Sequence, residues 1–299
     1  MRYLVTGSNG GLGSALVRTL IERGHDVCGV DAVARADARC PTLVGTLIDP
    51  YTVHRAFERF GVPDGVAHLA NHTNAQHAPQ EMVLRENLAM NTSVIVGSLQ
   101  AGVRRLVFAS SVQAMLGGIE RWAEIGDDNA VFPPAFPISE RTPARPSNTY
   151  GLSKLLTEQA LEHGAGPMMG FGATCVSVRL PFLMREQAFE RNLASTGRPD
   201  FRWGGCEAYC YLHIDDAADA MARALTEDIS AGHHVLWCAA PDARGGASVA
   251  ELVDAYYAEV PGAEEARRTG TFHDCSRAFD LLGWAPSRVL ERARAGSHG

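Results

Sequence analysis

Short runs of apolar, β-branched residues alternate with longer stretches of helical periodicity through the first two-thirds of the chain. This alternation predicts a parallel sheet covered by helices on both faces. One more buried strand is expected at Val235–Cys238. The other predicted strands are Arg2–Thr6, Asp26–Val30, Thr42–Thr46, Val66–Leu69, Arg104–Ala109 and Thr174–Arg179, and the clearest predicted helices are Leu12–Arg23, Gln80–Ala101 and Tyr150–His163.

The alternation loosens after Arg179, and the later chain shows signals for the ends of helices instead. Ser248 and Glu251 have the spacing of a capping box, which predicts the start of a helix. Gly283, followed closely by proline, is typical of a helix end. The proline-rich stretch 117–147 is expected to be a long connection, and such connections inside a compact domain are usually functional.

Closely spaced glycines separate the first predicted strand from the first predicted helix. Glycine lets the backbone turn tightly and approach a pyrophosphate, and the free N–H groups of a helix N-terminus favour an anion. Because the glycines lie between a strand and a helix, they favour a dinucleotide site over a plain turn. The predicted cofactor contacts of this loop are Gly7, Asn9, Gly10, Gly11, Leu12 and Gly13.

Two aspartates follow the next predicted strands. Asp31 ends the second strand, where a carboxylate accepts hydrogen bonds from the adenosine ribose and repels a 2′-phosphate. We therefore expect NAD in preference to NADP, with Arg35 and Arg39 close enough in sequence to weaken that preference. Asp49, after the third strand, either hydrogen-bonds the adenine amino group or caps the helix that follows.

Lys154 is the only lysine among the 27 Lys and Arg residues, and it lies four residues after Tyr150. Residues four apart share one face of a helix, so the ammonium is expected beside the phenol. A neighbouring positive charge favours an ionised phenol, which suits proton exchange with an alcohol–carbonyl pair. The alternative is a surface lysine left in an arginine-rich chain. The specific role is favoured because lysine is a compact charge whose pKa shifts easily.

Composition argues against several classes of partner and site. The net charge of −7 argues against nucleic acid or an anionic membrane as the main partner. The seven cysteines, an odd number in a chain long enough to bury a core, are expected to be reduced, and no cysteine or histidine spacing predicts a metal site. The chain opens directly into a strand and has no long apolar segment, so we expect a cytoplasmic protein.

Further segments accompany the glycine loop and the Tyr-Lys pair: His68-Leu69-Ala70, Asn87, Ser110-Ser111, Tyr211–Asp216 and Leu282–Pro286. In this order and spacing they resemble the extended short-chain dehydrogenase/reductase family, the NAD-dependent epimerase/dehydratase group, over nearly the whole chain.

The resemblance implies a Rossmann-type doubly wound parallel sheet with a small mixed C-terminal substrate-binding subdomain. The NAD-binding domain would comprise residues 1–179 and about 212–240, and the subdomain would comprise 180–211 and 241–299. Leu69, Ala70, Lys154 and Asp49 join the expected NAD contacts.

The resemblance also implies catalytic roles. Tyr150 would be the general acid/base, and Lys154 would bind the nicotinamide ribose and lower the pKa of the phenol. Ser111 would hydrogen-bond the substrate oxygen, where one such donor contributes about 2.7–4 kcal/mol. Ser110 competes with Ser111 for this role. Asn87 would steady the helix that carries it, or else be a surface polar residue.

Two positions depart from the pattern of family members that act on nucleotide-linked sugars. Phe182 stands where those members have Asn, and Tyr209 stands where they have an Arg that pairs with the sugar diphosphate. Losing that Arg removes a bidentate anion clamp, unless Arg198 or Arg202 replaces it. The segment 111–113 lacks the carboxylate of the dehydratases, which argues against dehydration.

Three functions therefore stay open. We favour NAD-dependent interconversion of a secondary alcohol and a ketone on a small or medium polar substrate. The alternatives are an NAD-dependent nucleotide-sugar epimerase and a non-catalytic NAD-binding regulator, against which the intact Ser, Tyr and Lys set argues. The resemblance implies a homodimer formed through the helices 80–101 and 150–163. Expected substrate contacts, at the carboxyl edge of the sheet, are Thr73, Asn74, Gln113, Trp203 and Tyr209.

Replacing Asp31 with alanine tests the ribose assignment. The variant Asp31→Ala should lose much of its discrimination against NADP, because the carboxylate that repels a 2′-phosphate is gone. The ratio of the dissociation constants for NAD and NADP, measured by calorimetry on both proteins, checks this. An unchanged ratio would count against the ribose role.

Overall fold

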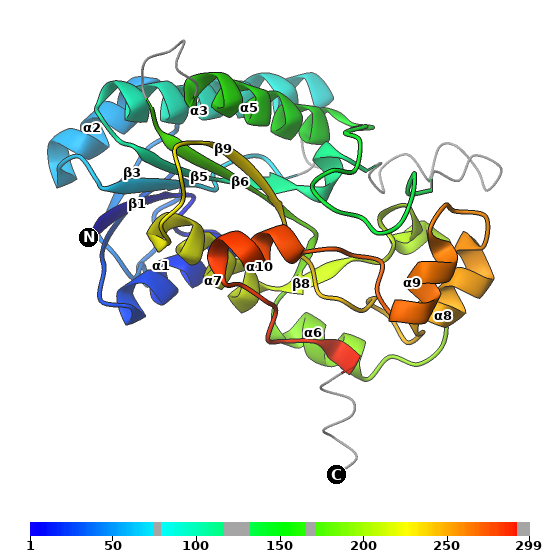
Figure 1. The fold of residues 1–299 in the computed structure, drawn as a ribbon. Coiled ribbons are helices and arrows are strands. Elements are labelled where there is room, and N and C mark those ends of the chain that lie inside the picture. The colour runs from blue at the N-terminus through cyan, green and yellow to red at the C-terminus, as the bar shows by residue number, and fades with distance from the viewer. Residues whose placement is uncertain (74–78, 117–131, 166–171, 292–299) are drawn as a thin grey trace.

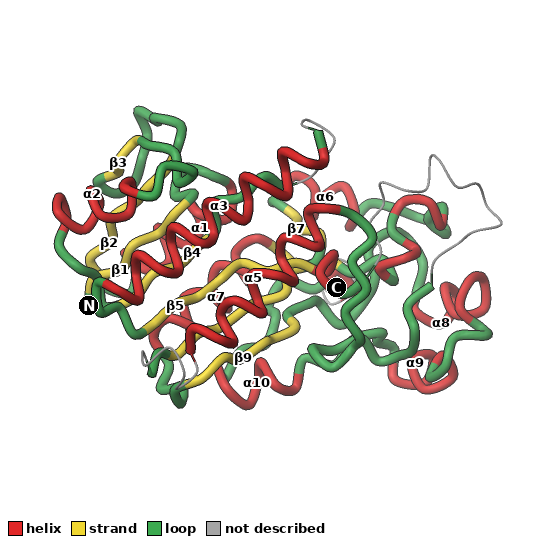
Figure 2. The backbone as a smooth tube through the Cα atoms, turned by 90° about the horizontal axis from the view of Figure 1, so that it is seen from above, coloured by secondary structure: helices red, strands yellow, loops and turns green. Residues whose placement is uncertain are grey.

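The computed structural model describes residues 1–73, 79–116, 132–165 and 172–291. Within these residues, seven parallel strands form one sheet (Figures 1 and 2). From one edge to the other they are β3 (Thr42–Val44), β2 (Asp26–Asp31), β1 (Arg2–Thr6), β4 (Gly65–His68), β5 (Arg105–Ser111), β6 (Thr174–Leu180) and β9 (Gly232–Trp237). Strands β1 and β4 are adjacent where the winding reverses, which is where doubly wound sheets bind ligands.

The central strands are apolar because helices cover both of their faces. All four residues of β4 and all seven residues of β6 are buried. Continuous burial of this kind is typical of parallel strands. The predicted doubly wound parallel sheet is therefore confirmed.

Helices form one layer on each face of the sheet (Figure 1). One layer contains α2 (Tyr51–Phe60), α3 (Gln80–Gln100) and α5 (Thr149–Ala165), and the other contains α1 (Gly11–Glu22), α7 (Ile214–Thr226) and α10 (Ser276–Leu282). Each layer has its own apolar core against the strands. None of the described helices is both long enough and apolar enough to cross a membrane, and the cytoplasmic location stays a prediction.

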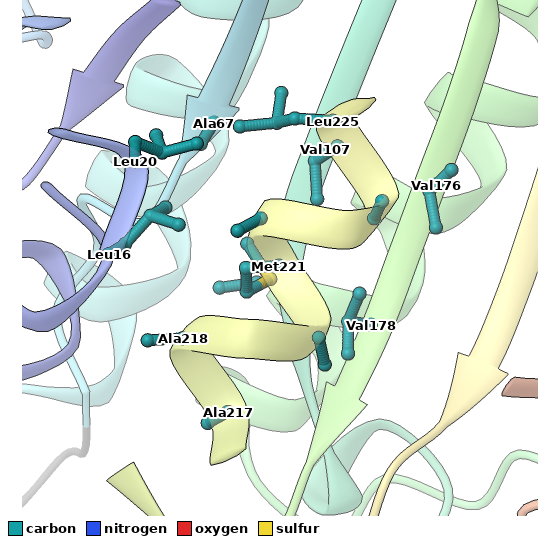
Figure 3. Packing of buried hydrophobic residues seen from close by; sticks show 14 of the residues in the cluster. Leu16, Leu20, Ala67, Val107, Val176, Val178, Ala217, Ala218, Met221 and Leu225 are labelled. Atoms are coloured by element: carbon teal, nitrogen blue, oxygen red, sulfur yellow. The ribbon is translucent and has the colours of Figure 1, made fainter. Parts of the chain in front are cut away.

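Small side chains allow helix α7 to approach the sheet closely (Figure 3). Five of its eight buried residues are alanines, and Met221 and Leu225 fill the remaining space. Leu16 and Leu20 of α1 and Val178 of β6 belong to the same apolar cluster. Alanine loses no side-chain entropy in a helix, so this face packs tightly at little conformational cost.

A third apolar cluster lies beyond the carboxyl edge of the sheet and is rich in aromatic rings. The ring centroid of Phe136 lies 4.5 Å from that of Phe272 and 5.5 Å from that of Tyr257. The elements of this region are β7 (Phe182–Met184), α6 (Glu186–Leu193), η5 (Phe201–Trp203), η6 (Gly205–Glu207), β8 (Tyr211–His213), α8 (Val249–Leu252), η7 (Val253–Tyr257) and α9 (Ala263–Thr269). Strands β7 and β8 pair in parallel as a separate small sheet.

Both predicted helix-end signals are confirmed. Glu251 N–H donates to Ser248 Oγ at 3.3 Å, and Ser248 N–H donates to the carboxylate of Glu251 at 2.8 Å. Helix α10 ends at Leu282, directly before Gly283, whose φ of 59° lies in the left-handed region that glycine favours.

Some boundaries differ from the sequence prediction. Strand β5 continues to Ser111 instead of ending at Ala109, so that Ser111 stands at the carboxyl edge of the sheet. Strand β3 ends earlier than predicted, at Val44. Helix α10 packs against α7 under the main sheet, although its residues fall in the predicted subdomain. The domain boundaries themselves stay a prediction.

Candidate active site

A cavity of about 780 Å³ runs along the carboxyl ends of β1, β4 and β5. The glycine loop lines one part of it, and the residues from the end of β5 and the start of α5 line another. Of the predicted site residues, those that line it are Gly7, Gly10, Gly11, Leu12, Gly13, Asp31, Leu69, Ala70, Thr73, Ser111, Gln113, Tyr150 and Lys154. Residues far apart in the sequence thus meet in one space.

The glycine loop is shaped by close backbone contacts that exclude larger side chains. Gly7 adopts a φ of 68°, and a Cβ atom there would lie 3.0 Å from the backbone nitrogen of Ala70. A Cβ atom on Gly13 would lie 1.9 Å from the carbonyl oxygen of Gly7. Among the described residues, no side chain caps the start of α1, whose first residues line the cavity. Their free N–H groups and the helix dipole form a site that fits a pyrophosphate.

Asp31 lies at the end of β2 with its carboxylate held in place. Its two oxygens accept hydrogen bonds from the backbone N–H groups of Asn9 and Val33, each at 2.9 Å. The side-chain amide of Asn9 turns away to the carbonyl of Val33, so only its backbone supports the site. Asp31 faces the cavity, as a ribose-binding carboxylate would.

Asp49 does not line the cavity. Its carboxylate accepts a hydrogen bond from Tyr51 N–H at 3.0 Å, at the start of α2, and pairs with Arg55 at 2.7 Å. These contacts at the start of α2 are of the kind that the capping alternative predicts, and the adenine contact stays a prediction.

Arg185 is a cavity residue that the sequence analysis missed. It follows β7, and its guanidinium lies against Gly11, so close that a Cβ atom there would be 2.4 Å from Nη2. A guanidinium beside the start of α1 adds positive charge where a pyrophosphate would bind. The position depends on the path of the chain after β7, which no local pattern indicated.

The ammonium of Lys154 is held by two oxygen acceptors at the wall of the cavity. Nζ donates to Oδ1 of Asn71 and to the carbonyl of Ala109, each at 2.7 Å. It also lies 4.6 Å from the ring centroid of Phe108 and 5.4 Å from that of Tyr150. The lysine is 2% exposed, so the reading of it as a surface residue is wrong.

Asn71 connects this lysine to the strands through buried hydrogen bonds. Oδ1 of Asn91 accepts from Nδ2 of Asn71 at 2.6 Å and pairs with Nε2 of His68 at 2.8 Å. Nδ1 of His68 pairs with Oγ1 of Thr6 at 2.7 Å. Burial lowers the pKa of His68 to about 3, so the ring is neutral, and the acceptor Asn91 assigns its proton to Nε2.

Burial shifts the pKa values of the two central groups in opposite directions. It lowers the pKa of Lys154 to about 7, against the opposing charge of Glu158, and raises the pKa of Tyr150 to about 12. The Ser111 hydroxyl lowers the pKa of the phenol, and the charge of Glu207 raises it. Lys154 is not among the groups that shift the pKa of the phenol here, so its predicted lowering of that pKa stays a prediction.

The two serines at the end of β5 have different surroundings. Ser110 donates to Oε1 of Glu158 at 2.6 Å, and Arg179 pairs with the same buried carboxylate at 2.8 Å. Ser111 Oγ accepts from Gln113 N–H at 3.2 Å and faces the phenol of Tyr150. Ser110 thus completes a buried ion pair, and Ser111 is the serine that suits the predicted catalytic role.

Asn87 is buried in α3 and holds the loop after β4. Its Oδ1 accepts from His72 N–H at 2.8 Å, and its Nδ2 donates to the carbonyl of His72 and to Ser153 Oγ, both at 3.1 Å. The alternative of a surface polar residue is wrong, since Asn87 has no exposed surface. It links α3, α5 and the loop that carries Asn71, which makes it a positioning residue.

The predicted substrate contacts are met only in part. Thr73 and Gln113 line the cavity, whereas Trp203 is 66% exposed and lies outside it. Tyr209 is fully buried and donates to the carbonyl of Pro199 at 3.3 Å, so it does not face the cavity either. Asn74 lies outside the described residues.

The family of this chain follows from the sequence match together with this site. A model of the NAD dependent epimerase/dehydratase family matches residues 3–236. The chain belongs to this family. It is therefore an NAD-dependent enzyme of the extended short-chain dehydrogenase/reductase type, and the Rossmann-type cavity fits that cofactor.

Family members resemble the chain over nearly its full length. The UDP-glucose 4-epimerase of Streptomyces lividans is 26% identical, and the match covers 96% of this chain and 92% of that protein. The UDP-glucose 4-epimerase from Bifidobacterium longum, in complex with NAD+ and UDP, has a TM-score of 0.69 at 20% identity, with 99% and 97% of the two chains covered. A short-chain dehydrogenase/reductase superfamily protein from Agrobacterium tumefaciens with bound NAD gives 0.69 at 19% identity, with 99% and 96% covered.

The shifted pKa of Lys154 predicts a pH-dependent stability difference between the wild type and Lys154→Met. The lysine pKa is about 7 in the folded protein, against an ordinary 10.5, so the unfolded chain binds more protons between these values. The wild type should therefore gain roughly 2–4 kcal/mol relative to Lys154→Met as the pH rises from 7 to 10. Urea unfolding of both proteins without cofactor measures this, and parallel stability curves would contradict it.

Proposed function

We propose that the enzyme transfers hydride between NAD and the carbon of a secondary alcohol or ketone in this cavity. The observation that carries the proposal is the meeting of Ser111, Tyr150 and Lys154 in the same space as the glycine loop. A polarising donor, an acid/base and a cation close to a dinucleotide site are the groups that this chemistry requires.

The residues of the chain supply the proton transfer and the electrostatic support. In the oxidising direction, the phenolate of Tyr150 takes the proton of the substrate hydroxyl as the C–H bond gives up hydride, and the C–O bond becomes a carbonyl. NAD supplies the hydride acceptor. Ser111 donates a hydrogen bond to the reacting oxygen, and Lys154 offsets the charge of the phenolate. The reverse direction returns the proton from the phenol to the oxygen.

Epimerisation of a nucleotide-linked sugar is the overall reaction that the comparisons favour. It uses this hydride step twice on one carbon, and UDP-glucose 4-epimerases match the chain over nearly its whole length. Net oxidation or reduction of a small polar substrate is the second candidate. Phe182 favours it, because a partly exposed aromatic ring stands on the cavity wall where nucleotide-sugar enzymes have an amide.

One assay separates the two reactions and tests the acid/base. The purified protein is incubated with UDP-galactose without added cofactor, and separately with NAD and UDP-galactose or free galactose. An epimerase yields UDP-glucose in the first assay, and a dehydrogenase yields NADH only in the second. Tyr150→Phe should lower the turnover of either reaction by roughly 10²–10⁴-fold, because the proton acceptor is lost.

Tyr51→Phe is the matched control, since Tyr51 is 68% exposed on α2 and lies outside the cavity. It should keep wild-type turnover. If Tyr150→Phe also keeps wild-type turnover while its NAD affinity is unchanged, the proposed role of the phenol is wrong.

We further propose that the enzyme forms a homodimer through α3 and α5. These helices lie side by side, and each exposes a large apolar residue, Val96 at 39% and Leu156 at 36%. Leu156→Arg should shift the protein from dimer toward monomer, because a charge would be buried in the interface. Light scattering after gel filtration measures the mass, and a wild type that is monomeric at micromolar concentration overturns the proposal.

A further inference from the structure

Glu207 is a buried carboxylic acid in the cavity wall that the proposed hydride transfer does not use. It is the last residue of η6, is 3% exposed, and lines the same cavity as Tyr150 and Ser111. Its charge acts on the phenol of Tyr150, which shows that the two groups lie close enough to interact. The sequence analysis gave Glu207 no role, although it expected Tyr209, two residues later, to contact the substrate.

Within the part of the chain that the structure describes, Oε1 of Glu207 has no hydrogen-bond partner. A buried polar group without a partner costs stability, and a carboxylate costs more than a neutral group. Burial accordingly raises the pKa of Glu207 to about 7. Such a costly group in a native fold calls for a partner that binds there.

The neighbouring cation does not satisfy this carboxyl. The charge of Arg244 lowers the pKa of Glu207, but the opposing effect of burial is larger. The guanidinium of Arg244, however, lies 5.0 Å from the ring centroid of Phe182, and its Nε also lacks a partner among the described residues. A closed ion pair would have satisfied both groups, so the carboxyl of Glu207, a residue of the cavity wall, keeps an unpaired oxygen within the described residues.

The backbone beside Glu207 is held in an uncommon conformation. Ala208 and Tyr209 follow it with φ values of 50° and 52°, in the left-handed region that non-glycine residues rarely adopt. Such a residue costs stability, and strain of this kind gathers at functional sites. Here it turns the Tyr209 side chain inward and leaves Glu207 facing the cavity.

The charge along the cavity indicates which chemistry fits each end. The start of α1 and Arg185 make the glycine-loop end positive, which suits a pyrophosphate. Glu207 makes the end near Tyr150 carboxylic, where a phosphate or carboxylate would be repelled. A hydroxyl group satisfies a carboxyl oxygen by donating to it, and it belongs to the same class of substrate that Tyr150 and Ser111 act on.

We propose that Glu207 is a substrate-binding residue that accepts a hydrogen bond from a hydroxyl near the reacting carbon, so that the site selects neutral polyhydroxylated substrates of the sugar type. This inference rests on the proposed function of the cavity and adds a residue that sets its specificity. Glu207 sets affinity and specificity, while Tyr150 transfers the proton.

Binding measurements on Glu207 variants test this without relying on turnover. Calorimetry measures the dissociation constants of galactose and UDP-galactose for the NAD-loaded wild type, Glu207→Leu and Glu207→Gln. The leucine variant should bind at least one of these sugars roughly 10–100-fold more weakly, because it loses a hydrogen bond to a charged group. The glutamine variant, which keeps an acceptor oxygen, should recover part of the loss.

Single-deoxy galactose analogues identify the hydroxyl. For one analogue, 2-deoxy, 3-deoxy or 6-deoxy, the wild type and Glu207→Leu should bind with equal affinity, because the partner of Glu207 is already missing. Thermal unfolding gives a second measurement, in which the substitution that weakens sugar binding should not lower stability. Glu207→Leu should unfold at the same or a higher temperature than the wild type, since it removes an unpartnered buried carboxyl.

Glu162→Gln is the matched control, because the Glu162 side chain is 68% exposed and outside the cavity. It should leave every affinity unchanged. Equal sugar binding by Glu207→Leu and the wild type, or no sugar binding by the wild type, overturns the inference. If Tyr150→Phe abolishes turnover in that case, the proposed function still stands.

Discussion

The position of the proposed catalytic groups depends on how the ammonium of Lys154 is held. It is bound by Asn71, from the loop after β4, and by the carbonyl of Ala109 in β5, while its own backbone belongs to α5. A buried cation is costly unless acceptors replace its water, so these contacts fix three elements relative to one another. Tyr150, one helical turn earlier, takes its position from the same arrangement.

This arrangement explains why the chain keeps one lysine among so many arginines. The two acceptors and the ring of Phe108 surround a single nitrogen at short distance. A compact ammonium fits between them, whereas a guanidinium is a wide planar fork that needs several acceptors in one plane. The buried hydrogen bonds from Asn71 through Asn91 to His68 then connect this lysine to β4 and, through Thr6, to the strand before the glycine loop.

The glycine loop, Asp31 and the Tyr-Lys pair could be predicted from the sequence. Each lies at the end of a strongly periodic element and follows from a local pattern. Arg185 and Glu207 could not be found in that way, because their places depend on the long-range pairing of β7 with β8 and on the turn after η6. The sequence analysis wrongly expected Tyr209 to contact the substrate. No glycine marks its left-handed backbone, which turns the side chain into the core.

The charge of Glu207 acts on the phenol of Tyr150, and the ammonium of Lys154 lies 5.4 Å from the centroid of the same ring. Burial and the charge of Glu207 together raise the pKa of Tyr150 to about 12, whereas an acid/base works best when its pKa is close to the working pH. A substrate hydroxyl that donates to Glu207 stabilises the carboxylate, so tighter recognition makes the phenol harder to ionise. In the proposed mechanism the charge of Lys154 opposes this effect, and burial lowers the pKa of that amine to about 7. Substrate recognition and proton transfer therefore place opposite demands on the charge of Glu207. The balance between this carboxyl and the amine of Lys154 decides how readily Tyr150 exchanges its proton.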